Sequence, residues 1–199
     1  HKYDMLTPAQ FIGWDNFKQI LFTDDKFRTS LAVTLKYVAM AVPLRLTVAL
    51  AVAMLINRPS RLSGLYRVLF YIPSVIGGSV AVSIMWRNIF GDTGLINGLL
   101  TGLGLDPIYF FKQPFTALLI LVLLAGWQFG SSMLVFLGGL KNIPNELYEA
   151  AEVDGASKLR QFFSITLPVL SPIIFFNLVM QTISSFLTFT PAYIISNGT

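Results

Sequence analysis

The first long apolar stretch of the chain is LAVTLKYVAMAVPLRLTVALAVAMLI, residues 31–56, in which Lys36 and Arg45 are the charged side chains. At about 1.5 Å per residue, a helix of this length reaches roughly 40 Å, while the hydrocarbon core of a bilayer is about 30 Å thick. The stretch therefore predicts a helix that crosses a membrane with some tilt.

Three similar stretches follow, at residues 65–90, 115–140 and 168–193, and none of them contains Asp or Glu. Of the 199 residues, 12% are charged and 54% are hydrophobic. Charged residues make up about 25% of a typical soluble domain, so a soluble protein is excluded. We predict an all-α fold: a single polytopic transmembrane helical bundle over residues 1–199, with four spans.

Basic residues predict how these spans are oriented. Arg58, Arg61 and Arg67 surround the first connection between spans, and no acidic residue lies near them. Loops rich in Lys and Arg stay in the cytoplasm. Alternation of the spans then places residues 91–114 outside the cell and residues 141–167 in the cytoplasm.

The two ends of the chain are polar. Residues 1–29 mix charged with aromatic side chains, which suits an extracellular segment at the membrane–water interface. The chain does not begin with Met, and Ser196-Asn197-Gly198-Thr199 resembles a loop. We interpret the chain as a fragment of a longer protein.

Several function classes are disfavoured by the residue types present. The chain has no cysteine, and its single histidine is His1, so we expect no catalytic residue and no metal site. Its net charge of +4 comes from scattered basic residues, so we expect no nucleic-acid partner. It lacks the Gly-x-x-x-x-Gly-Lys-Ser/Thr loop of an ATPase. The missing carboxylates in its spans disfavour a proton- or sodium-coupled carrier.

The polar interruption at residues 141–167 predicts two short helices. Pro144 suits the start of the first, and Gly155 suits the left-handed position that ends it. Ser157 can cap the second helix, and Pro168 is expected to begin or kink the span that follows.

One side of the first of these helices carries small side chains. A helical period places Leu147, Ala150, Ala151 and Asp154 together. Alanines permit the close approach of another surface, as a docking helix requires, although an ordinary surface helix would have the same pattern.

The same stretch resembles the EAA motif of ABC-importer permeases: Glu-Ala-Ala, three residues, Gly, nine residues, then Ile-x-Leu-Pro. The matching residues are Glu149, Ala150, Ala151, Gly155, Ile165, Leu167 and Pro168. A match of spacing over about 20 residues is specific. The surrounding chain is similar to the carbohydrate-uptake, maltose-type branch of these permeases. The similar segments are FIGWDNF at 11–17, RVLFYIP at 67–73, GLIN at 94–97 and the region of Trp127.

This resemblance implies the ABC importer permease fold and a function. The chain would be a multi-pass permease in the cytoplasmic membrane of a bacterium or archaeon, importing a sugar, with one further span on each side of the present residues. Residues 141–167 would form the cytoplasmic coupling loop, in which the motif residues and Asp154 contact an ATPase. The implied partners are a second homologous permease, two ATP-binding subunits that use ATP and Mg, an extracellular solute-binding protein and membrane lipid. The chain itself would bind no cofactor.

Two rival functions remain open at this stage. The first is an ion-coupled secondary carrier or channel subunit, and the second is a membrane scaffold that transports nothing. Uptake that needs ATP and survives a collapsed ion gradient separates the importer from the carrier. A scaffold predicts no ATPase activity that substrate stimulates.

Neutral polar side chains within the spans are the candidates for a sugar pathway. In the last span they recur at spacings of three and four residues, and in the third span they lie beside Trp127. Amides and hydroxyls match the donors and acceptors of a sugar, although hydrogen bonding between helices commonly uses the same residue types. The candidates are Tyr71, Ser74, Gln128, Ser131, Asn177, Gln181, Ser184, Ser185 and Thr188, with Ser132 beside Ser131. Arg45 is either a pore or partner contact or a residue paired with a carbonyl or a neighbour.

Overall fold

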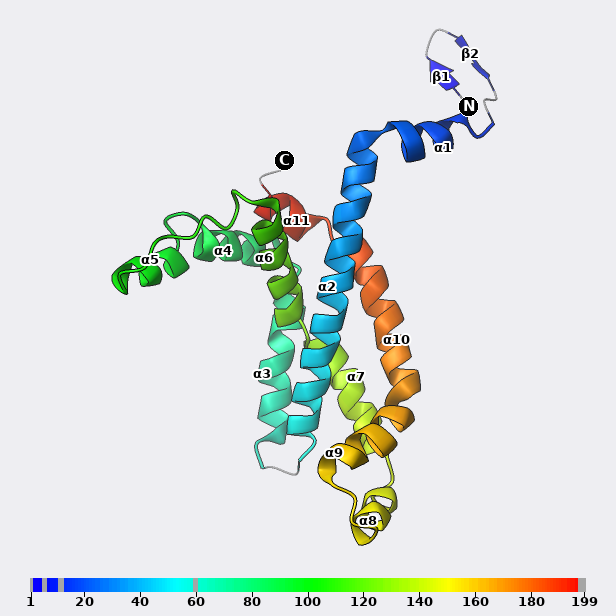
Figure 1. Cartoon of the computed structure of the whole chain (residues 1–199), viewed down its shortest axis with the longest axis vertical. Helices are drawn as coiled ribbons and strands as arrows, with labels where there is room; N and C mark the ends of the chain where they lie inside the picture. Colours follow the sequence, from blue (N-terminus) through cyan, green and yellow to red (C-terminus); the bar gives the residue numbers. More distant parts are fainter. Residues whose placement is uncertain (1, 5–6, 11–12, 59–60, 197–199) are drawn as a thin grey trace. The chain divides into compact units, whose positions relative to one another are not determined.

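The computed structural model describes residues 2–4, 7–10, 13–58 and 61–196, with side chains from residue 13 onward. The chain divides into two units, residues 1–37 and residues 38–199. The described elements are almost all helices, so the predicted all-α fold is confirmed (Figure 1).

The first unit contains the small amount of strand that the prediction did not include. Strands β1 (Lys2–Asp4) and β2 (Thr7–Gln10) pair antiparallel, with Lys2 opposite Gln10 and Asp4 opposite Thr7. Helix α1 (Asp15–Lys18) and the π-helical turn η1 (Gln19–Thr23) lead into the long helix α2 (Asp25–Ile56). The Asp24 carboxylate accepts a hydrogen bond from the Phe27 N–H at 3.0 Å, which caps the start of α2.

The second unit holds the rest of α2 and the remaining helices. They are α3 (Ser63–Ile76), α4 (Val80–Phe90), α5 (Leu95–Gly102), α6 (Pro114–Trp127), α7 (Gly130–Lys141), α8 (Asn145–Val153), α9 (Lys158–Gln161), the π-helical turn η2 (Phe162–Thr166), α10 (Leu167–Phe186) and α11 (Thr190–Ile195).

Two described helices are long and apolar enough to cross a membrane unbroken. They are α2 and the continuous helix Lys158–Phe186, which is made of α9, η2 and α10. The predicted span 65–90 is occupied by two helices, because α3 meets the segment Val80–Gly102 at 93°. The predicted span 115–140 consists of α6 and α7, which meet at 43°. If each bent pair is one crossing, the number of spans reaches four.

The sharper bend follows from the residues at the break. Gly77 and Gly78 disfavour a continuous helix, and the Ser79 hydroxyl accepts a hydrogen bond from the Val82 N–H at 3.3 Å. Ser79 has an extended ψ of 150°, so it caps a new helix with a new direction.

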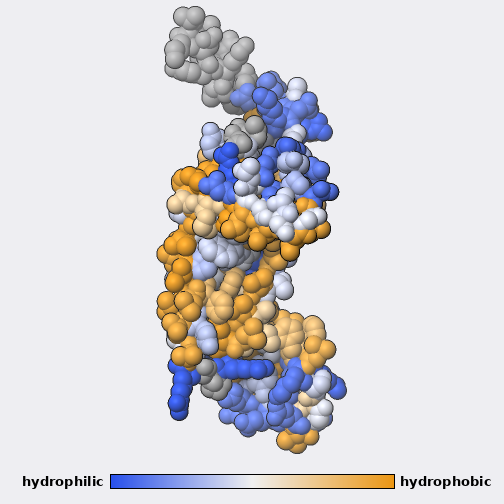
Figure 2. Space-filling view, turned by 90° about the vertical axis from the view of Figure 1, so that its left-hand side faces the viewer, coloured by the Kyte–Doolittle hydropathy of each residue, from blue (hydrophilic) through white to orange (hydrophobic). Residues whose placement is uncertain are grey.

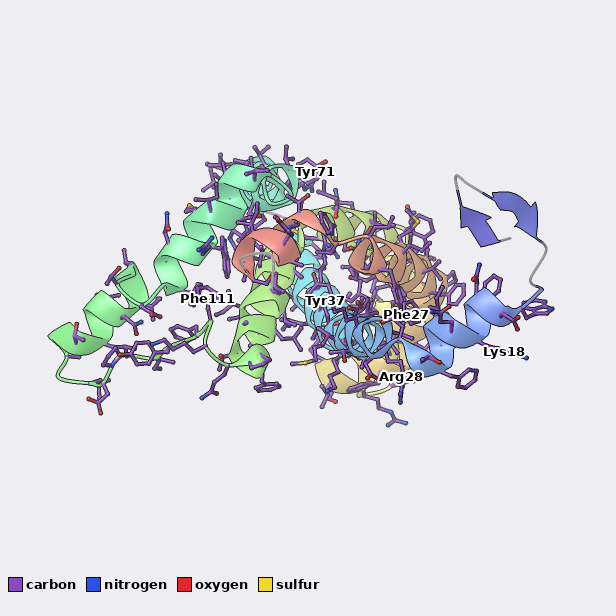
Figure 3. The ribbon with its side chains drawn as sticks, turned by 90° about the horizontal axis from the view of Figure 1, so that it is seen from above. Lys18, Phe27, Arg28, Tyr37, Tyr71 and Phe111 are labelled. Carbon is purple, nitrogen blue, oxygen red and sulfur yellow. The ribbon has the colours of Figure 1, made fainter. Side chains whose placement is uncertain are left out.

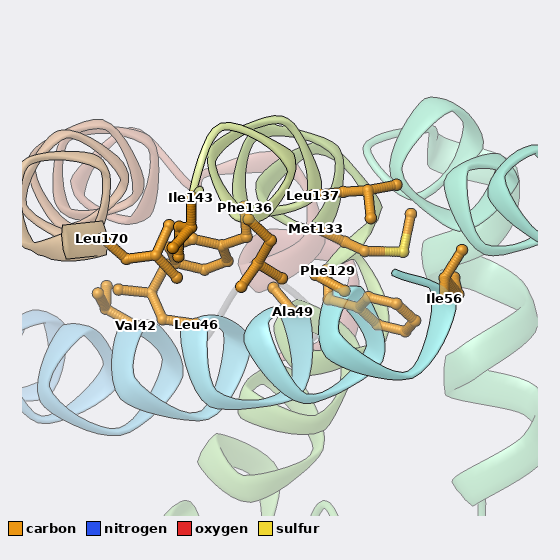
Figure 4. Packing of buried hydrophobic residues seen from close by; sticks show 12 residues of the cluster. Val42, Leu46, Ala49, Ile56, Phe129, Met133, Phe136, Leu137, Ile143 and Leu170 are labelled. Atoms are coloured by element: carbon orange, nitrogen blue, oxygen red, sulfur yellow. The ribbon is translucent and has the colours of Figure 1, made fainter. Parts of the chain in front are cut away.

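The larger core lies between α2, α7 and α10. Val42, Leu46 and Ala49 recur on one face of α2 and pack against Met133 and Phe136 of α7 (Figure 4). Leu170 of α10 completes this cluster. A Cβ added to Gly139 of α7 would lie 2.3 Å from the Ile173 Cδ1 atom of α10, so small residues bring these helices together.

A second cluster joins α4, α6 and α11. Val82, Ile120, Leu124 and Ile195 are buried there, and Phe111, labelled in Figure 3, packs against them. The predicted span 168–193 is interrupted by this arrangement, since α10 ends at Phe186 and the separate helix α11 packs on α4.

Large apolar side chains also cover the outside of the second unit. Val75 is 64% exposed and Phe175 is 68% exposed. The face seen in Figure 2 carries a broad apolar band, with hydrophilic side chains below it. Such a surface is costly in water and suits a lipid environment.

Candidate functional site

The motif at residues 149–168 contains the end of one helix, a tight turn and the start of a second helix. Helix α8 begins after Pro144 and ends in a Schellman motif. The N–H of Gly155 donates to the Glu152 carbonyl at 3.0 Å, and the N–H of Ala156 donates to the Ala151 carbonyl at 2.8 Å. Gly155 has a φ of +73°, so the predicted left-handed position is confirmed.

The second helix of the loop is the beginning of the long helix Lys158–Phe186. The Ser157 hydroxyl accepts a hydrogen bond from the Arg160 N–H at 3.3 Å, as predicted for a cap. Pro168 lies in the first turn of α10, which continues from η2 without a break. The wide turn η2 lies directly before Pro168, where a proline has no N–H to donate and its ring crowds the preceding turn.

One side of α8 is fixed to the core of the second unit. The hydroxyl groups of Tyr148 and Thr166 share a hydrogen bond at 2.9 Å, and Thr166 is 5% exposed. Tyr148 and Ile165 pack against the cluster of α2, α7 and α10, to which the buried Ile143 belongs. The helix therefore cannot move far without carrying the start of the long helix with it.

The other side of α8 faces away from the core. Glu149, Ala150, Asp154 and Gly155 are exposed, whereas Ala151 is half-buried. Val153 is 89% exposed. At the far end of the motif, Ile165 and Leu167 are half-buried and Pro168 is exposed. The motif thus divides into an exposed part at its beginning and a more buried part at its end.

An ion pair closes the loop across Gly155. The Lys158 ammonium donates to the Glu152 carboxylate, and the hydrogen bond and charge of Lys158 lower the pKa of that carboxyl below its usual range. Neither this ion pair nor the Tyr148–Thr166 hydrogen bond was predicted from the sequence. Glu152 and Lys158 are six residues apart, a spacing that brings side chains together only when a tight turn lies between them.

Four of the predicted pathway residues lie on or beside the second and third predicted spans. The Ser74 hydroxyl donates to the Gln128 carbonyl at 2.9 Å and accepts from the Ser131 N–H at 3.1 Å. The Gln128 amide donates to the Gly77 carbonyl at 3.0 Å. Tyr71 lies on the same helix, α3, and is 39% exposed (Figure 3).

These contacts join the break between α3 and α4 to the break between α6 and α7. A Cβ on Gly130 would lie 2.5 Å from the Phe70 carbonyl oxygen, so the two backbones are in direct contact. At the break between α6 and α7, the Gln128 carbonyl and the Ser131 N–H both form hydrogen bonds with the Ser74 hydroxyl instead of within a helix. In this structure Ser74, Gln128 and Ser131 therefore form hydrogen bonds between helices, which was the second interpretation of these residues.

The polar stripe on α10 is divided between two faces. Asn177, Gln181 and Ser185, spaced four residues apart, are buried, whereas Ser184 is exposed and Thr188 is half-buried. The Asn177 amide donates to the Ile173 carbonyl at 3.2 Å, one turn earlier in its own helix. Thr188 donates to the Ser184 carbonyl at 3.1 Å.

Two buried polar side chains in the second unit have unused hydrogen-bonding capacity. Among the residues that the structure describes, the Gln181 carbonyl oxygen and the Ser132 hydroxyl have no hydrogen-bond partner. Gln181 is 8% exposed and Ser132 is fully buried. An unpaired buried polar group costs about 1–3 kcal/mol, so a partner for both groups would be stabilising.

Ser132 and Gln181 lie at similar distances along their helices from the contact between α7 and α10. Gly139 of α7 contacts Ile173 of α10, and the two helices run in opposite directions (Figure 1). Ser132 precedes Gly139 by seven residues, and Gln181 follows Ile173 by eight. Both intervals correspond to about 11 Å along a helix.

Arg45 is half-buried on α2, one turn from the buried Val42 and Ala49. In the described ranges, no group of three or more His, Asp or Glu side chains is arranged to hold a metal ion.

Comparison with known proteins places this geometry in a family. Residues 31–199 match the family model described as "Binding-protein-dependent transport system inner membrane component". The chain is 59% identical over 197 residues to "Probable ABC transporter permease protein YesP" of Bacillus subtilis (strain 168), covering 98% of the chain and 64% of that protein. It is 32% identical over 194 residues to "Lactose transport system permease protein LacF" of Rhizobium radiobacter, covering 96% of the chain and 64% of that protein.

A solved structure has the same fold. It is the crystal structure of a bacterial ABC transporter involved in the import of the acidic polysaccharide alginate, with a TM-score of 0.76 and 25% identity. The match covers 94% of this chain and 68% of that one. The chain therefore spans about two thirds of the length of the proteins that it matches, and the resemblance drawn from the EAA motif is confirmed. The chain belongs to the family of inner membrane components of binding-protein-dependent transport systems.

Proposed function

We propose that the chain is the membrane-spanning permease part of an ATP-driven sugar importer. In this proposal it forms the translocation pathway together with a second, homologous permease. An extracellular solute-binding protein delivers the sugar, and two ATP-binding subunits use ATP and Mg to drive the cycle. The chain itself catalyses no reaction and holds no cofactor.

The coupling loop carries this proposal. Glu149, Ala150 and Asp154 are exposed on α8, while Tyr148 and Ile165 hold the other side of the helix to the core. This division is what a docking helix requires: one face is free for an ATPase subunit, and the other transmits its movement. In our proposal, Glu149 makes a polar contact with the ATPase, and the Schellman end at Gly155 directs the chain back toward the membrane.

The sugar class is supported by the relatives and by two buried polar groups, one on α7 and one on α10. One relative is named as a lactose permease and one structural neighbour imports alginate. Gln181 and Ser132 offer an unpaired carbonyl oxygen and a hydroxyl, which suit the hydroxyl groups of a sugar. We include Asn177, Ser184, Ser185 and Thr188 in the proposed pathway.

On α3, α6 and α7, Tyr71, Ser74, Gln128 and Ser131 complete the proposed pathway. The last three already bond between helices, so exposing them to sugar requires the two helix breaks to separate during transport. An ion-coupled carrier is not favoured, since no carboxylate lies within the predicted spans.

A reconstituted complex tests the coupling function. The full-length chain would be assembled with its partner permease, ATPase subunits and binding protein in proteoliposomes, and sugar uptake measured with ATP and with a collapsed ion gradient. We expect uptake to require ATP, to survive loss of the gradient and to fall at least tenfold in Glu149→Lys. Glu146→Lys, an equally exposed charge reversal one turn earlier on α8, is the matched control.

Two results would overturn the proposal. One is ATP-coupled uptake by Glu149→Lys at the rate of the unaltered complex. The other is uptake that disappears with the ion gradient while ATP is present. Size-exclusion chromatography of each variant complex separates a docking defect from a failure of the chain to fold.

A further inference from the structure

We propose that a pocket between the end of α2 and the beginning of α3 binds an anionic phospholipid of the cytoplasmic leaflet. The pocket has a volume of about 260 Å³. Val52, Leu55 and Ile56 of α2 form one wall, and Tyr66 and Phe70 of α3 form the other. It is remote from the coupling loop in the sequence, and it has no part in the proposed sugar pathway.

The walls of the pocket suit an acyl chain. Its lining is apolar except at one end, and Leu55 is 68% exposed, so the pocket is open to the side. The neighbouring surface of α3 is also apolar, with Val68 58% exposed and Leu69 51% exposed. A hydrocarbon chain from the bilayer can therefore enter the pocket without leaving an apolar environment.

The polar end of the pocket is positively charged. Arg58 lines it, Arg61 follows in the same loop, and the chain contains no acidic residue between Asp25 and Asp92. Within residues 13–58 and 61–196, the ion pairs involve other basic residues, so neither arginine is neutralised there. Each Lys or Arg near an anionic membrane surface strengthens binding roughly fivefold.

Further groups at this end favour a phosphate. Ser63 lines the pocket and lies at the amino end of α3, a helix of 14 residues without a side-chain cap. The positive end of the helix dipole attracts an anion at this position. Tyr66 is an aromatic residue of the type that gathers at membrane interfaces.

The combination of an apolar wall and a cationic end selects one occupant. Free phosphate would use the arginines but not the hydrocarbon walls, and a neutral lipid would use the walls but not the arginines. An anionic phospholipid uses both the apolar walls and the arginines. Positive charge on this loop also predicts its place on the cytoplasmic side.

Native mass spectrometry of the complete, delipidated complex tests the proposal. Phosphatidylglycerol and phosphatidylcholine with the same acyl chains would be added in turn, and the retained lipid measured. We expect preferential retention of phosphatidylglycerol, a roughly fivefold loss in Arg58→Gln and an about 25-fold loss in Arg58→Gln/Arg61→Gln. Lys141→Gln, which removes an exposed charge elsewhere on the predicted cytoplasmic side, should retain the lipid normally.

A second pair of variants tests the apolar wall without changing charge. Val52→Trp places a large side chain in the pocket and should exclude the lipid, whereas Leu69→Trp, on the exposed surface outside the pocket, should not. A phosphatidylglycerol with a photoreactive acyl chain should label peptides from residues 52–70. For any variant that fails to assemble, this labelling of the unaltered complex still decides the proposal.

The proposal is overturned by equal retention of the two lipids, by normal retention in Val52→Trp, or by labelling confined to other segments. Displacement of the lipid by millimolar glycerol phosphate would also overturn it, because the pocket would then recognise a phosphate without its acyl chains. A partner subunit that covers the pocket in the assembled complex would be seen as absence of labelling. None of these results depends on whether the complex transports sugar.

Discussion

Tyr148 joins α8 to a buried residue of the long helix Lys158–Phe186. Its hydroxyl bonds to that of the buried Thr166, 18 positions later. No local sequence pattern predicts such a pair, since it requires the tight end at Gly155 and the return of the chain along α9. Gly155 itself was predictable, because a left-handed helix end selects glycine for a local conformational reason.

We expect Tyr148→Phe to weaken coupling. The substitution leaves the Thr166 hydroxyl buried without this partner, which costs about 1–3 kcal/mol. ATP hydrolysis should continue while the amount of sugar imported per ATP falls. In a double-mutant cycle, Thr166→Val should add little to the effect of Tyr148→Phe. Additive losses from the two substitutions would contradict a role for the hydrogen bond between them.

The ion pair between Glu152 and Lys158 is expected to make the stability of the loop depend on pH. Lys158 lowers the pKa of the Glu152 carboxyl from its ordinary value of 4.5. A lowered pKa means that the ionised pair stabilises the fold above pH 4.5 and that this stabilisation is lost as the pH falls through the lowered pKa. Because the pair is exposed, its contribution is small.

Carboxyl carbon NMR of the labelled chain measures this directly. Glu152 should titrate below 4.5, and Lys158→Gln should return its pKa toward that ordinary value. Unchanged titration in Lys158→Gln would mean that another group is responsible for the shift.

At the scale of the elements, apolar stretches were easier to predict than their bends. Residues 31–56 lie within one long helix, as expected. In contrast, residues 65–90 and 115–140 are each divided between two helices. Both helices of each bent pair are apolar, so the hydropathy of the sequence does not reveal where the chain changes direction. The bends depend on the Ser79 cap and on contacts such as Ser74 with Gln128, 54 residues apart.

We expect Gly130→Ala to destabilise the contact between the two breaks. The added methyl group would lie 2.5 Å from the Phe70 carbonyl oxygen and 2.8 Å from the Tyr71 Cα atom, so backbone would have to move. Such overpacking typically costs about 1–3 kcal/mol. Thermal unfolding in detergent would measure this loss.

Gly138→Ala is the matched control on the same helix. No heavy atom lies within 4 Å of the position of its Cβ. Alanine is a better helix former than glycine by about 1 kcal/mol, so this variant should be at least as stable as the unaltered chain. A stable Gly130→Ala variant would show that the two breaks are not held in close contact in the membrane.

At the scale of the whole molecule, the proposed path of the sugar is the feature that is least predictable from sequence. Ser, Asn and Gln in a membrane helix serve either a solute or a neighbouring helix, and both uses produce the same spacing. The structure separates the candidates by their partners. Ser74 and Gln128 bond between helices, whereas the carbonyl oxygen of Gln181 has no partner among the described residues.

Gln181→Leu tests the pathway at this scale. Because the buried carbonyl oxygen lacks a described partner, we expect the variant to be no less stable, while sugar uptake falls about tenfold or more through lost contact with the sugar. Uptake and thermal unfolding would be measured on the same complex.

Ser83→Ala provides a comparison, since the Ser83 hydroxyl is fully buried but already bonds to the Ser79 carbonyl at 3.1 Å. It should lose about 1 kcal/mol of stability and retain uptake. Unchanged uptake in Gln181→Leu would assign Gln181 to helix packing.

The continuity of Lys158–Phe186 has a mechanical consequence. A helix of 29 residues is about 43 Å long, and it runs without interruption from the coupling loop past Gln181. Such a rod behaves as a lever: a tilt of about 10° around its midpoint displaces each end by roughly 4 Å, in opposite directions. A movement of the helix end near Lys158 is therefore accompanied by a movement of the end near Phe186 in the opposite direction.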